Sequence, residues 1–239
     1  MITTPISLGS NEVHIWVIPL DQNPLDGMDL YQYLSQDEIN RAERFHFDKH
    51  RRRFAISHNA LRQILAMYLD VNPAEIEYDQ TSHGKPWLTG PFKEGGLFFN
   101  LTHSHELALT AVTRRGEIGI DVEYLKDFVD IDGIATRFFS TLEQAVYLDL
   151  PEDQKVKGFY NCWTRKEAFI KAIGEGLSHP LDKFDVTLAP GDTPRFLRIG
   201  EEEDDSSKWT LESIDSISGY VGAVALRDIG IQFQFFEFE

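Results

Sequence analysis

The chain has 239 residues and carries 39 acidic against 23 basic side chains, a net charge of −16 at pH 7. This charge disfavours a non-specific nucleic-acid binder, because phosphate contacts dominate such affinity. No apolar run approaches the roughly 18 to 20 residues that cross a bilayer, and the N-terminal residues lack a signal-peptide pattern. Cys162 is the only cysteine, which excludes an internal disulfide and a cysteine-rich zinc site. We therefore expect a folded cytoplasmic protein without nucleic-acid or membrane partners.

The first half of the chain mixes strands and helices. Residues 13–20 read as a strand, and the capping-box pair Ser35 and Glu38 predicts a helix that runs from there towards Phe47. The chain between Arg41 and Arg53 forms a basic island, RAERFHFDKHRRR, which is either a solvated helix face or an anion site. Apolar spacings of three and four predict a second helix that Asn72 and Pro73 end. Shorter features follow: a strand at 76–78, a turn at 82–86, strands at 97–101 and 107–113, and a polar loop, THSHE, between these last two.

The second half continues the mixture. We predict a strand at 118–123, helices at 138–148 and 159–173, and strands around 184–188, 209–214 and 220–226. Gly174 is suited to end the second helix, and the acidic stretch 201–205 reads as a solvated loop. Strands and helices alternate without segregation or repeats, which indicates an α+β class.

Asp121 and Glu123 lie two residues apart on the predicted strand IGIDVE. Alternate side chains of a strand share a face, so both carboxylates project together, opposite Ile118, Ile120 and Val122. Two carboxylates at this spacing suit a hard cation better than a shared proton. The alternative is an ordinary half-exposed strand with acidic residues facing water.

Trp163, Glu167 and Lys171 stand four residues apart on the predicted helix 159–173, so they form one stripe. An intrahelical Glu–Lys pair would explain two of them, but not why they share the stripe of the tryptophan. Together with Asp121 and Glu123, Glu167 completes a predicted acidic metal site acting on a phosphate-bearing substrate.

Two further segments offer groups that bind anions. His103 in FNLTHS is flanked by hydroxyls and is placed to donate a hydrogen bond to a phosphate oxygen. His103 and His105 could also suggest zinc, although no third nitrogen or thiolate ligand lies nearby. Lys85 and Pro86 form a turn that presents a cation on a rigid backbone.

The order GKPWL, FNLTHS, IGIDVEY and FYNCWTRKEAFIKAIGEGL resembles the Sfp-type 4′-phosphopantetheinyl transferases, and cyanobacterial members in particular. The resemblance spans about 45–185 by motif. It implies two similar α/β subdomains in a pseudo-twofold arrangement: an N-terminal subdomain over 1–115, with the nucleotide contacts, and a C-terminal subdomain over 116–239, with the carboxylates. Coenzyme A would lie in the cleft between them.

The resemblance also implies an activity. Members of this family move 4′-phosphopantetheine from coenzyme A to a serine hydroxyl of an apo acyl, polyketide or peptidyl carrier protein, with Mg²⁺ or, in its place, Mn²⁺, and release adenosine 3′,5′-bisphosphate. The carried-over roles are as follows: metal ligands Asp121, Glu123 and Glu167; catalytic residues Glu167, Lys171 and Glu143; coenzyme contacts Arg44, Arg53, Lys85, Pro86, Thr102, His103 and Lys171. The general base is left open between Glu143, Glu167 and a water.

The sequence departs from the family pattern at three positions. Thr102 stands where serine is usual and keeps a hydroxyl, Trp87 replaces a smaller or tyrosyl residue, and Glu38 falls where some relatives carry a lysine, a loss that Arg41 could offset. Because coenzyme A and carriers are anionic, docking should use a local apolar and basic surface, which we expect around 128–139, including Arg137. The resemblance implies a monomer. The alternatives are another magnesium-dependent phosphoryl or nucleotidyl transferase, without a P-loop to support it, and a non-enzymatic binding module.

Overall fold

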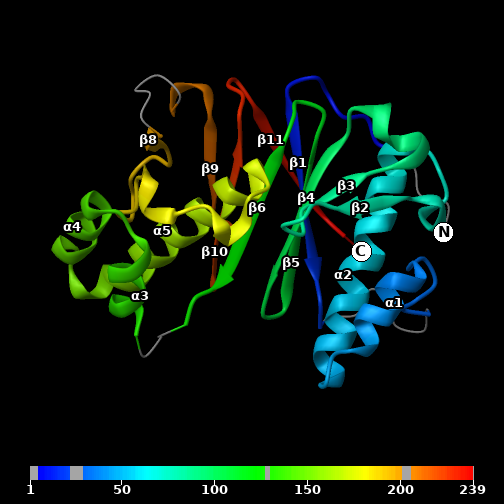
Figure 1. Ribbon diagram of the computed structural model, residues 1–239, viewed down its shortest axis with the longest axis horizontal. Helices are drawn as coiled ribbons and strands as arrows, with labels where there is room; N and C mark the ends of the chain where they lie inside the picture. The colour runs from blue at the N-terminus through cyan, green and yellow to red at the C-terminus, as the bar shows by residue number, and fades with distance from the viewer. Residues whose placement is uncertain (1–4, 22–28, 127–129, 201–205, 239) are drawn as a thin grey trace.

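The N-terminal half packs one long helix against an antiparallel sheet (Figure 1). The computed structural model describes residues 5–21, 29–126, 130–200 and 206–238. The elements of this half are β1 (Glu12–Pro19), α1 (Gln36–Glu43), α2 (Asp48–Leu69), β2 (Tyr78–Gln80), β3 (Pro86–Leu88), β4 (Phe98–Ser104) and β5 (Leu107–Thr113). β5 pairs antiparallel with both β1 and β4, while β2 and β3 form a separate hairpin.

The C-terminal half repeats this plan. Its elements are β6 (Ile118–Tyr124), α3 (Ile131–Phe138), α4 (Thr141–Asp149), α5 (Glu152–Ile173), β7 (Phe184–Val186), β8 (Phe196–Ile199), β9 (Thr210–Ile214), β10 (Tyr220–Leu226) and β11 (Gln232–Glu237). β10 lies between β6 and β9 in an antiparallel sheet, and α5, which like α2 has 22 residues, packs on it. The fold is therefore α+β with two similar halves, as predicted. Short 3₁₀ segments occupy Pro73–Glu75, Gly90–Gly95, Gly176–Ser178, Leu181–Lys183 and Ser206–Lys208.

Three apolar clusters hold the layers together, and strand alternation assigns side chains to them. Trp16 and Ile18 of β1 face α2, whereas Val13 and Ile15 of the same strand face the second sheet. The third cluster, which includes Phe169, packs α5 against its own sheet. In Figure 1, α5 and α2 therefore lie at opposite sides of the molecule with both sheets between them. None of the described helices is long and apolar enough to span a membrane.

β11 links the two halves, because it leaves the C-terminal half and joins the N-terminal sheet. It pairs parallel with β1, from Glu12 opposite Gln232 to Val17 opposite Glu237. The predicted boundary at 115/116 falls between β5 and β6, yet the end of the chain crosses back over it. The N-terminal sheet thus depends on the C-terminal half for its edge strand.

Several local differences separate the structure from the sequence-based prediction. β4 continues through Ser104, so most of the predicted loop THSHE is strand, and only His105, with a φ of 54°, and Glu106 turn the chain. The helix predicted at 138–148 is α4, which begins at Thr141 after the Ser140 cap, and α3, which ends at Phe138, was not predicted. β3, β8 and β11 were not predicted, and α5 begins at Glu152 rather than at 159. The predicted acidic loop 201–205 lies outside the described residues.

Gly119 sets the distance between α5 and β6. A Cβ atom at this position would stand 2.0 Å from the carbonyl oxygen of Ala168 and 2.3 Å from the amide nitrogen of Ala172. Both atoms belong to the backbone of α5 and cannot turn aside. Only a residue without a side chain lets the helix backbone lie directly on the strand. This close approach brings the α5 side chains to the carboxylates of β6.

Candidate active site

The carboxylates of β6 emerge from the face opposite the shared core. Ile118, Ile120 and Val122 are buried between the two sheets, as the alternation predicts. Asp121 is only 4% exposed and Glu123 is half-buried. Burial of Asp121 excludes the alternative that both acids simply face water, because a buried charge needs a partner.

Lys171 of α5 supplies that partner. Its Nζ lies 2.6 Å from Asp121 Oδ1, and it also donates to the hydroxyl of Thr102 at 3.2 Å and to the carbonyl of Ile120 at 3.3 Å. Thr102 in turn donates to Asp121 Oδ1 at 3.1 Å. Lys171 is thus paired across the interface between strand and helix. Trp163, two turns earlier on the same stripe, packs instead against Phe138 and Phe159 in the apolar core.

Negative charge exceeds positive charge around Glu167. Burial raises the pKa of Glu167 to about 7, and the charges of Asp121 and Glu123 act in the same direction against the opposing charge of Lys171. Burial likewise raises the pKa of Glu123, although a hydrogen bond from Ser104 opposes the shift. The three predicted metal ligands therefore interact electrostatically. The charges of Lys171 and Lys126 oppose these shifts without cancelling them, and a bound cation would add positive charge.

The donor set fits a hard cation. Asp121 Oδ2 is buried and has no hydrogen-bond partner among the described residues. Oxygen ligands from carboxylates are those that Mg²⁺ prefers, with substrate phosphates and waters completing the shell. In the described part of the chain, no three His, Cys, Asp or Glu side chains already form a metal-binding group. The predicted ligands are therefore close together but not yet gathered around one point, and Lys171 holds Asp121.

A cavity of about 270 Å³ opens beside these groups and is lined from both halves. Lys85 and Pro86 contribute from the N-terminal half, and Glu167 and Lys171 from α5. The ammonium of Lys85 donates to the carbonyl of Ala172 at 2.7 Å and pairs with Glu117. Burial lowers the pKa of Lys85, and the pairing with Glu117 opposes that shift. The structure thus brings the predicted nucleotide contacts to the same cavity as the α5 residues.

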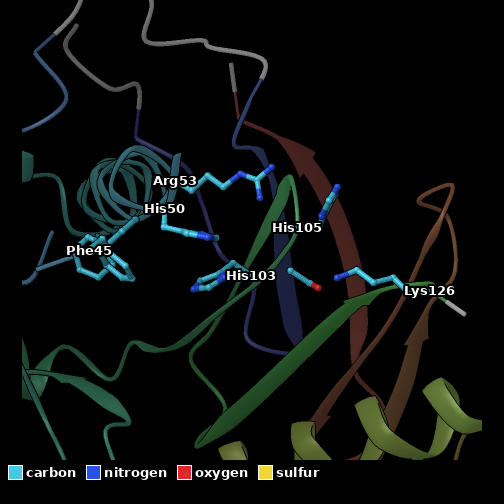
Figure 2. A pocket seen from close by; sticks show the side chains of 8 residues that line it. Phe45, His50, Arg53, His103, His105 and Lys126 are labelled. Carbon is cyan, nitrogen blue, oxygen red and sulfur yellow. The ribbon is translucent and has the colours of Figure 1, made fainter. Parts of the chain in front are cut away.

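A second cavity, of about 320 Å³, is lined by Arg53 and His103 together with Phe45 and Lys126 (Figure 2). Arg53 is bound to Asp21 through two hydrogen bonds of 2.7 Å. Burial lowers the pKa of His103, and the charge of Lys171 contributes in the same direction. This cavity combines cationic edges with aromatic walls, a combination suited to an anionic ligand. Arg44, by contrast, is exposed at the C-cap of α1 and lines neither cavity.

Glu143 lies in a setting that does not suit its predicted role. Its carboxylate accepts from the backbone amides of Ser140 and Val186, both at 2.8 Å, and pairs at 2.8 Å with Lys166. Glu143 is 1% exposed and Lys166 is fully buried. A carboxylate so enclosed cannot meet a substrate hydroxyl in this arrangement. The sequence contained the signal: Ser140 to Glu143 repeats the capping-box pattern of Ser35 to Glu38.

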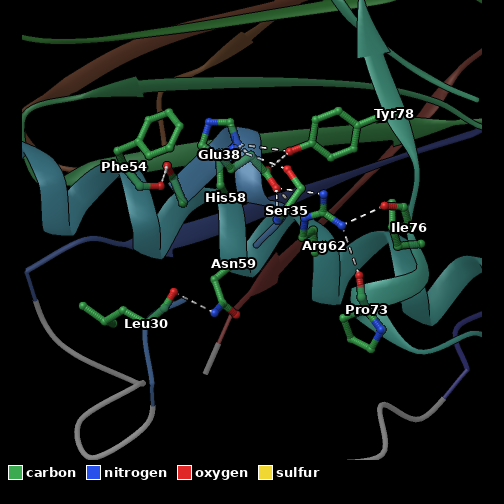
Figure 3. Close-up of polar contacts among 11 residues, drawn as sticks. Leu30, Ser35, Glu38, Phe54, His58, Asn59, Arg62, Pro73, Ile76 and Tyr78 are labelled. Atoms are coloured by element: carbon green, nitrogen blue, oxygen red, sulfur yellow. Dashed lines mark hydrogen bonds and ion pairs between the residues drawn. The ribbon is translucent and has the colours of Figure 1, made fainter. Parts of the chain in front are cut away.

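Glu38 is also directed inward (Figure 3). It accepts from the amide of Ser35 and from Nε of Arg62, both at 2.8 Å, and it contacts His58 and Tyr78. It therefore ties α1 to α2 and β2 rather than replacing a phosphate-binding lysine. Arg41, which could offset that loss, stacks over Phe54 at 5.3 Å and lines a cavity of about 240 Å³ beside this network.

Both halves of the chain match models of one family. Residues 117–225 match the 4′-phosphopantetheinyl transferase superfamily, and residues 26–115 match its N-terminal domain model. The chain is 42% identical over 233 residues to the 4′-phosphopantetheinyl transferase HetI of Nostoc sp., covering 98% of this chain and 95% of that protein. A Synechocystis sp. relative is 32% identical, covering 83% of this chain and 78% of the relative. The transferase Sfp of Bacillus subtilis is 30% identical over 156 residues, covering 65% and 67%.

These matches show that the chain belongs to the 4′-phosphopantetheinyl transferase superfamily. The resemblance stated from the motifs alone is confirmed, including its closeness to cyanobacterial members. The protein is a 4′-phosphopantetheinyl transferase, which excludes the non-enzymatic alternative and an unrelated phosphoryl transferase.

Proposed function

We propose that this enzyme transfers 4′-phosphopantetheine from coenzyme A to a serine hydroxyl of an apo acyl, polyketide or peptidyl carrier protein. The observation that supports this most directly is the grouping of Asp121, Glu123 and Glu167 with Lys171 beside cavities lined from both halves. Coenzyme A would extend between the two cavities, with its pyrophosphate at Lys171.

Asp121, Glu123 and Glu167 would hold Mg²⁺, or Mn²⁺ in its place. Such a cation supplies positive charge to the pyrophosphate, on which phosphoryl transfer depends. Lys171 would neutralise the same phosphates as a point charge once it leaves Asp121. Lys85 and Pro86 would contact the adenine end, and Arg53, Thr102 and His103 would contact coenzyme phosphates.

The reaction joins the serine Oγ to the β-phosphorus and breaks the bond from that phosphorus to the bridging oxygen. The bridging oxygen leaves on adenosine 3′,5′-bisphosphate, and the serine proton passes to a base within hydrogen-bond reach. Of the two candidate glutamates, Glu167 lines the cavity, while Glu143 is enclosed by Lys166 and two backbone amides. Glu167 or a water is therefore the proposed acceptor.

Carrier docking is proposed for the surface around α3. Residues 128 and 129 of the predicted segment lie outside the described residues. Most of the remainder forms the amphipathic helix α3, on which Arg137 is exposed and stacks over Phe138 at 5.1 Å. Charge reversal by Arg137→Glu should weaken carrier affinity several-fold without changing coenzyme affinity. Unchanged carrier affinity would contradict this placement. Monomeric state and cytoplasmic location stay predictions.

Mass spectrometry tests the proposed reaction. The protein is incubated with coenzyme A, Mg²⁺ and a panel of apo carrier proteins, with serine-to-alanine carriers as controls. We expect a phosphopantetheine-sized mass gain on at least one carrier and none on its alanine variant. Binding of coenzyme A and carrier without a mass gain on any of them would contradict the proposal.

A further inference from the structure

The two halves meet at β4 and β6, the edge strands of their sheets. They do not share a backbone ladder; side chains of β4 make the connection instead. Asn100 Oδ1 accepts from the amide of Ile120 at 2.9 Å, Thr102 donates to Asp121 at 3.1 Å, and Ser104 donates to Glu123 Oε2 at 2.7 Å. Positions two apart on a strand share a face, so one face of β4 holds β6 along its length.

The hydroxyl of Ser104 both donates and accepts a hydrogen bond. Its Oγ accepts the amide hydrogen of Tyr124 at 3.1 Å while its own hydrogen goes to Glu123. A serine hydroxyl has one hydrogen to donate and can accept as well. The Tyr124 amide therefore fixes the position of the oxygen, and the remaining donation is directed at the carboxylate. This geometry directs the Ser104 hydroxyl hydrogen at Glu123, at the edge of the cavity of about 320 Å³ that Ser104 also lines.

The hydrogen bond from Ser104 restrains Glu123, whose side chain is otherwise free to turn away from the other two carboxylates. Glu123 has three rotatable bonds, and the like charges of Asp121 and Glu167 favour its turning away from them. Asp121 is restrained by Lys171 and Thr102, but Glu123 has a different anchor. The bond from Ser104 occupies one carboxylate oxygen and orients the side chain while the other oxygen stays available for a ligand.

We propose that Ser104 is a positioning residue, by which the N-terminal half orients Glu123 for binding a divalent cation. The proposal rests on the proposed function, because it presumes that Glu123 is a metal ligand. Partners of metal ligands commonly change metal affinity or activity 10- to 100-fold when removed. Ser104 was missed from the sequence because residues 102–106 read as a loop, in which alternate side chains share no face.

Mn²⁺ binding, measured by the electron paramagnetic resonance signal of the free ion with coenzyme A present, tests the role. Ser104→Ala should weaken Mn²⁺ about 10-fold or more. Ser104→Thr, which keeps the hydroxyl, should restore most of the affinity. Thr110→Val is the matched control, since this buried hydroxyl of β5 has no hydrogen-bond partner in the described structure. Thermal unfolding of each variant shows whether it is folded, and Ser104→Cys replaces Ser104→Ala if the alanine variant is not.

The possible outcomes distinguish a failure of the proposed metal site from a failure of the role proposed for Ser104. Wild-type protein that binds no Mn²⁺ would contradict the proposed metal site. Wild-type binding with unchanged affinity in folded Ser104→Ala, or a loss in Ser104→Ala that Ser104→Thr does not restore, would contradict the role of Ser104 alone. Weakening in Ser104→Ala with recovery in Ser104→Thr supports it.

Discussion

At the scale of single residues, Glu143 and Glu167 are both held largely away from water but have opposite surroundings. Lys166 and two backbone amides compensate the charge of Glu143. Glu167 lies among other acids, and its pKa rises to about 7. A compensated carboxylate stabilises a fold, whereas an uncompensated one in a cavity is available for a ligand or a proton.

Glu143→Gln should therefore act on stability and not on chemistry. The change leaves Lys166 buried without its counter-ion, which costs about 3 to 5 kcal/mol of unfolding free energy. Denaturant unfolding measures this loss, and transfer rates normalised to folded protein should stay near wild type. A normal stability with a large loss of rate would instead restore Glu143 as the general base.

The sequence indicated the chemistry of the residues better than their roles. Asp121, Glu167 and Lys171 were brought together from a strand period and a helix period, because those spacings set which side chains share a face. For Glu143 the sequence allowed both a helix cap with Ser140 and a catalytic role, and the contact with Lys166 favours the cap. Such contacts depend on the tertiary fold.

At the scale of elements, the placement of α5 on β6 depends on Gly119. Gly119→Ala inserts a methyl group 2.0 Å from the Ala168 carbonyl oxygen, so the helix must shift. Overpacking of this kind typically costs about 1 to 3 kcal/mol. We expect a lower unfolding midpoint and a greater than proportional loss of transfer rate, since Lys171 would move from Asp121.

Gly95→Ala is the matched control for that change. The nearest atom to its added methyl group would be Leu69 Cδ2 at 3.8 Å, an ordinary contact distance. Thermal unfolding and transfer rates of both variants should be compared. Equal behaviour of Gly119→Ala and Gly95→Ala would show that the close approach does not position α5.

The Glu38 network, which joins α1 to α2 and β2, makes stability depend on pH. Burial alone would raise the pKa of Glu38, but hydrogen bonds from His58, Tyr78 and Ser35 and the charge of Arg62 lower it to about 2. A pKa below the unfolded value stabilises the fold above about pH 4.5, and this contribution is lost as the pH falls towards 2.

Glu38→Gln should lower stability at pH 7 by about 3 kcal/mol and flatten the loss of stability between pH 4.5 and 2. Glu43→Gln removes the same charge from an exposed position of α1 and serves as the control. Denaturant midpoints across the pH range measure both effects. If the stability of Glu38→Gln fell between pH 4.5 and 2 as steeply as that of the wild type, Glu38 would not be the source of this pH dependence.

Elements with strong local signals were predictable. The Ser35 cap set the start of α1, and the apolar run of β5 matches its predicted bounds of 107–113. The predicted strand at 76–78 is shifted to Tyr78–Gln80, because its register is set by pairing with Pro86–Leu88. β8 and β11 were not predicted because they are short strands with exposed positions, and pairing with their neighbours defines them.

At the scale of the whole molecule, the site belongs to neither half alone. β4 anchors the carboxylates of β6, Lys85 reaches the end of α5, and β11 completes the N-terminal sheet. The family resemblance predicted two similar halves with a cleft between them. No local sequence pattern indicated that β11 pairs with β1 of the N-terminal sheet. The hydrogen bonds between β4 and β6 and the pairing of β11 with β1 hold the carboxylates next to their anchors.

The most direct test of the account is the dependence of the single-turnover transfer rate on Mg²⁺ concentration, in the wild type and in Glu167→Gln. Glu175→Gln, an exposed change just beyond α5, is the control. We expect a saturable rise in rate with Mg²⁺ for wild type and control, and a loss of at least about 100-fold in Glu167→Gln at every concentration. A Glu167→Gln enzyme with a near-normal rate and an unchanged Mg²⁺ dependence would contradict it.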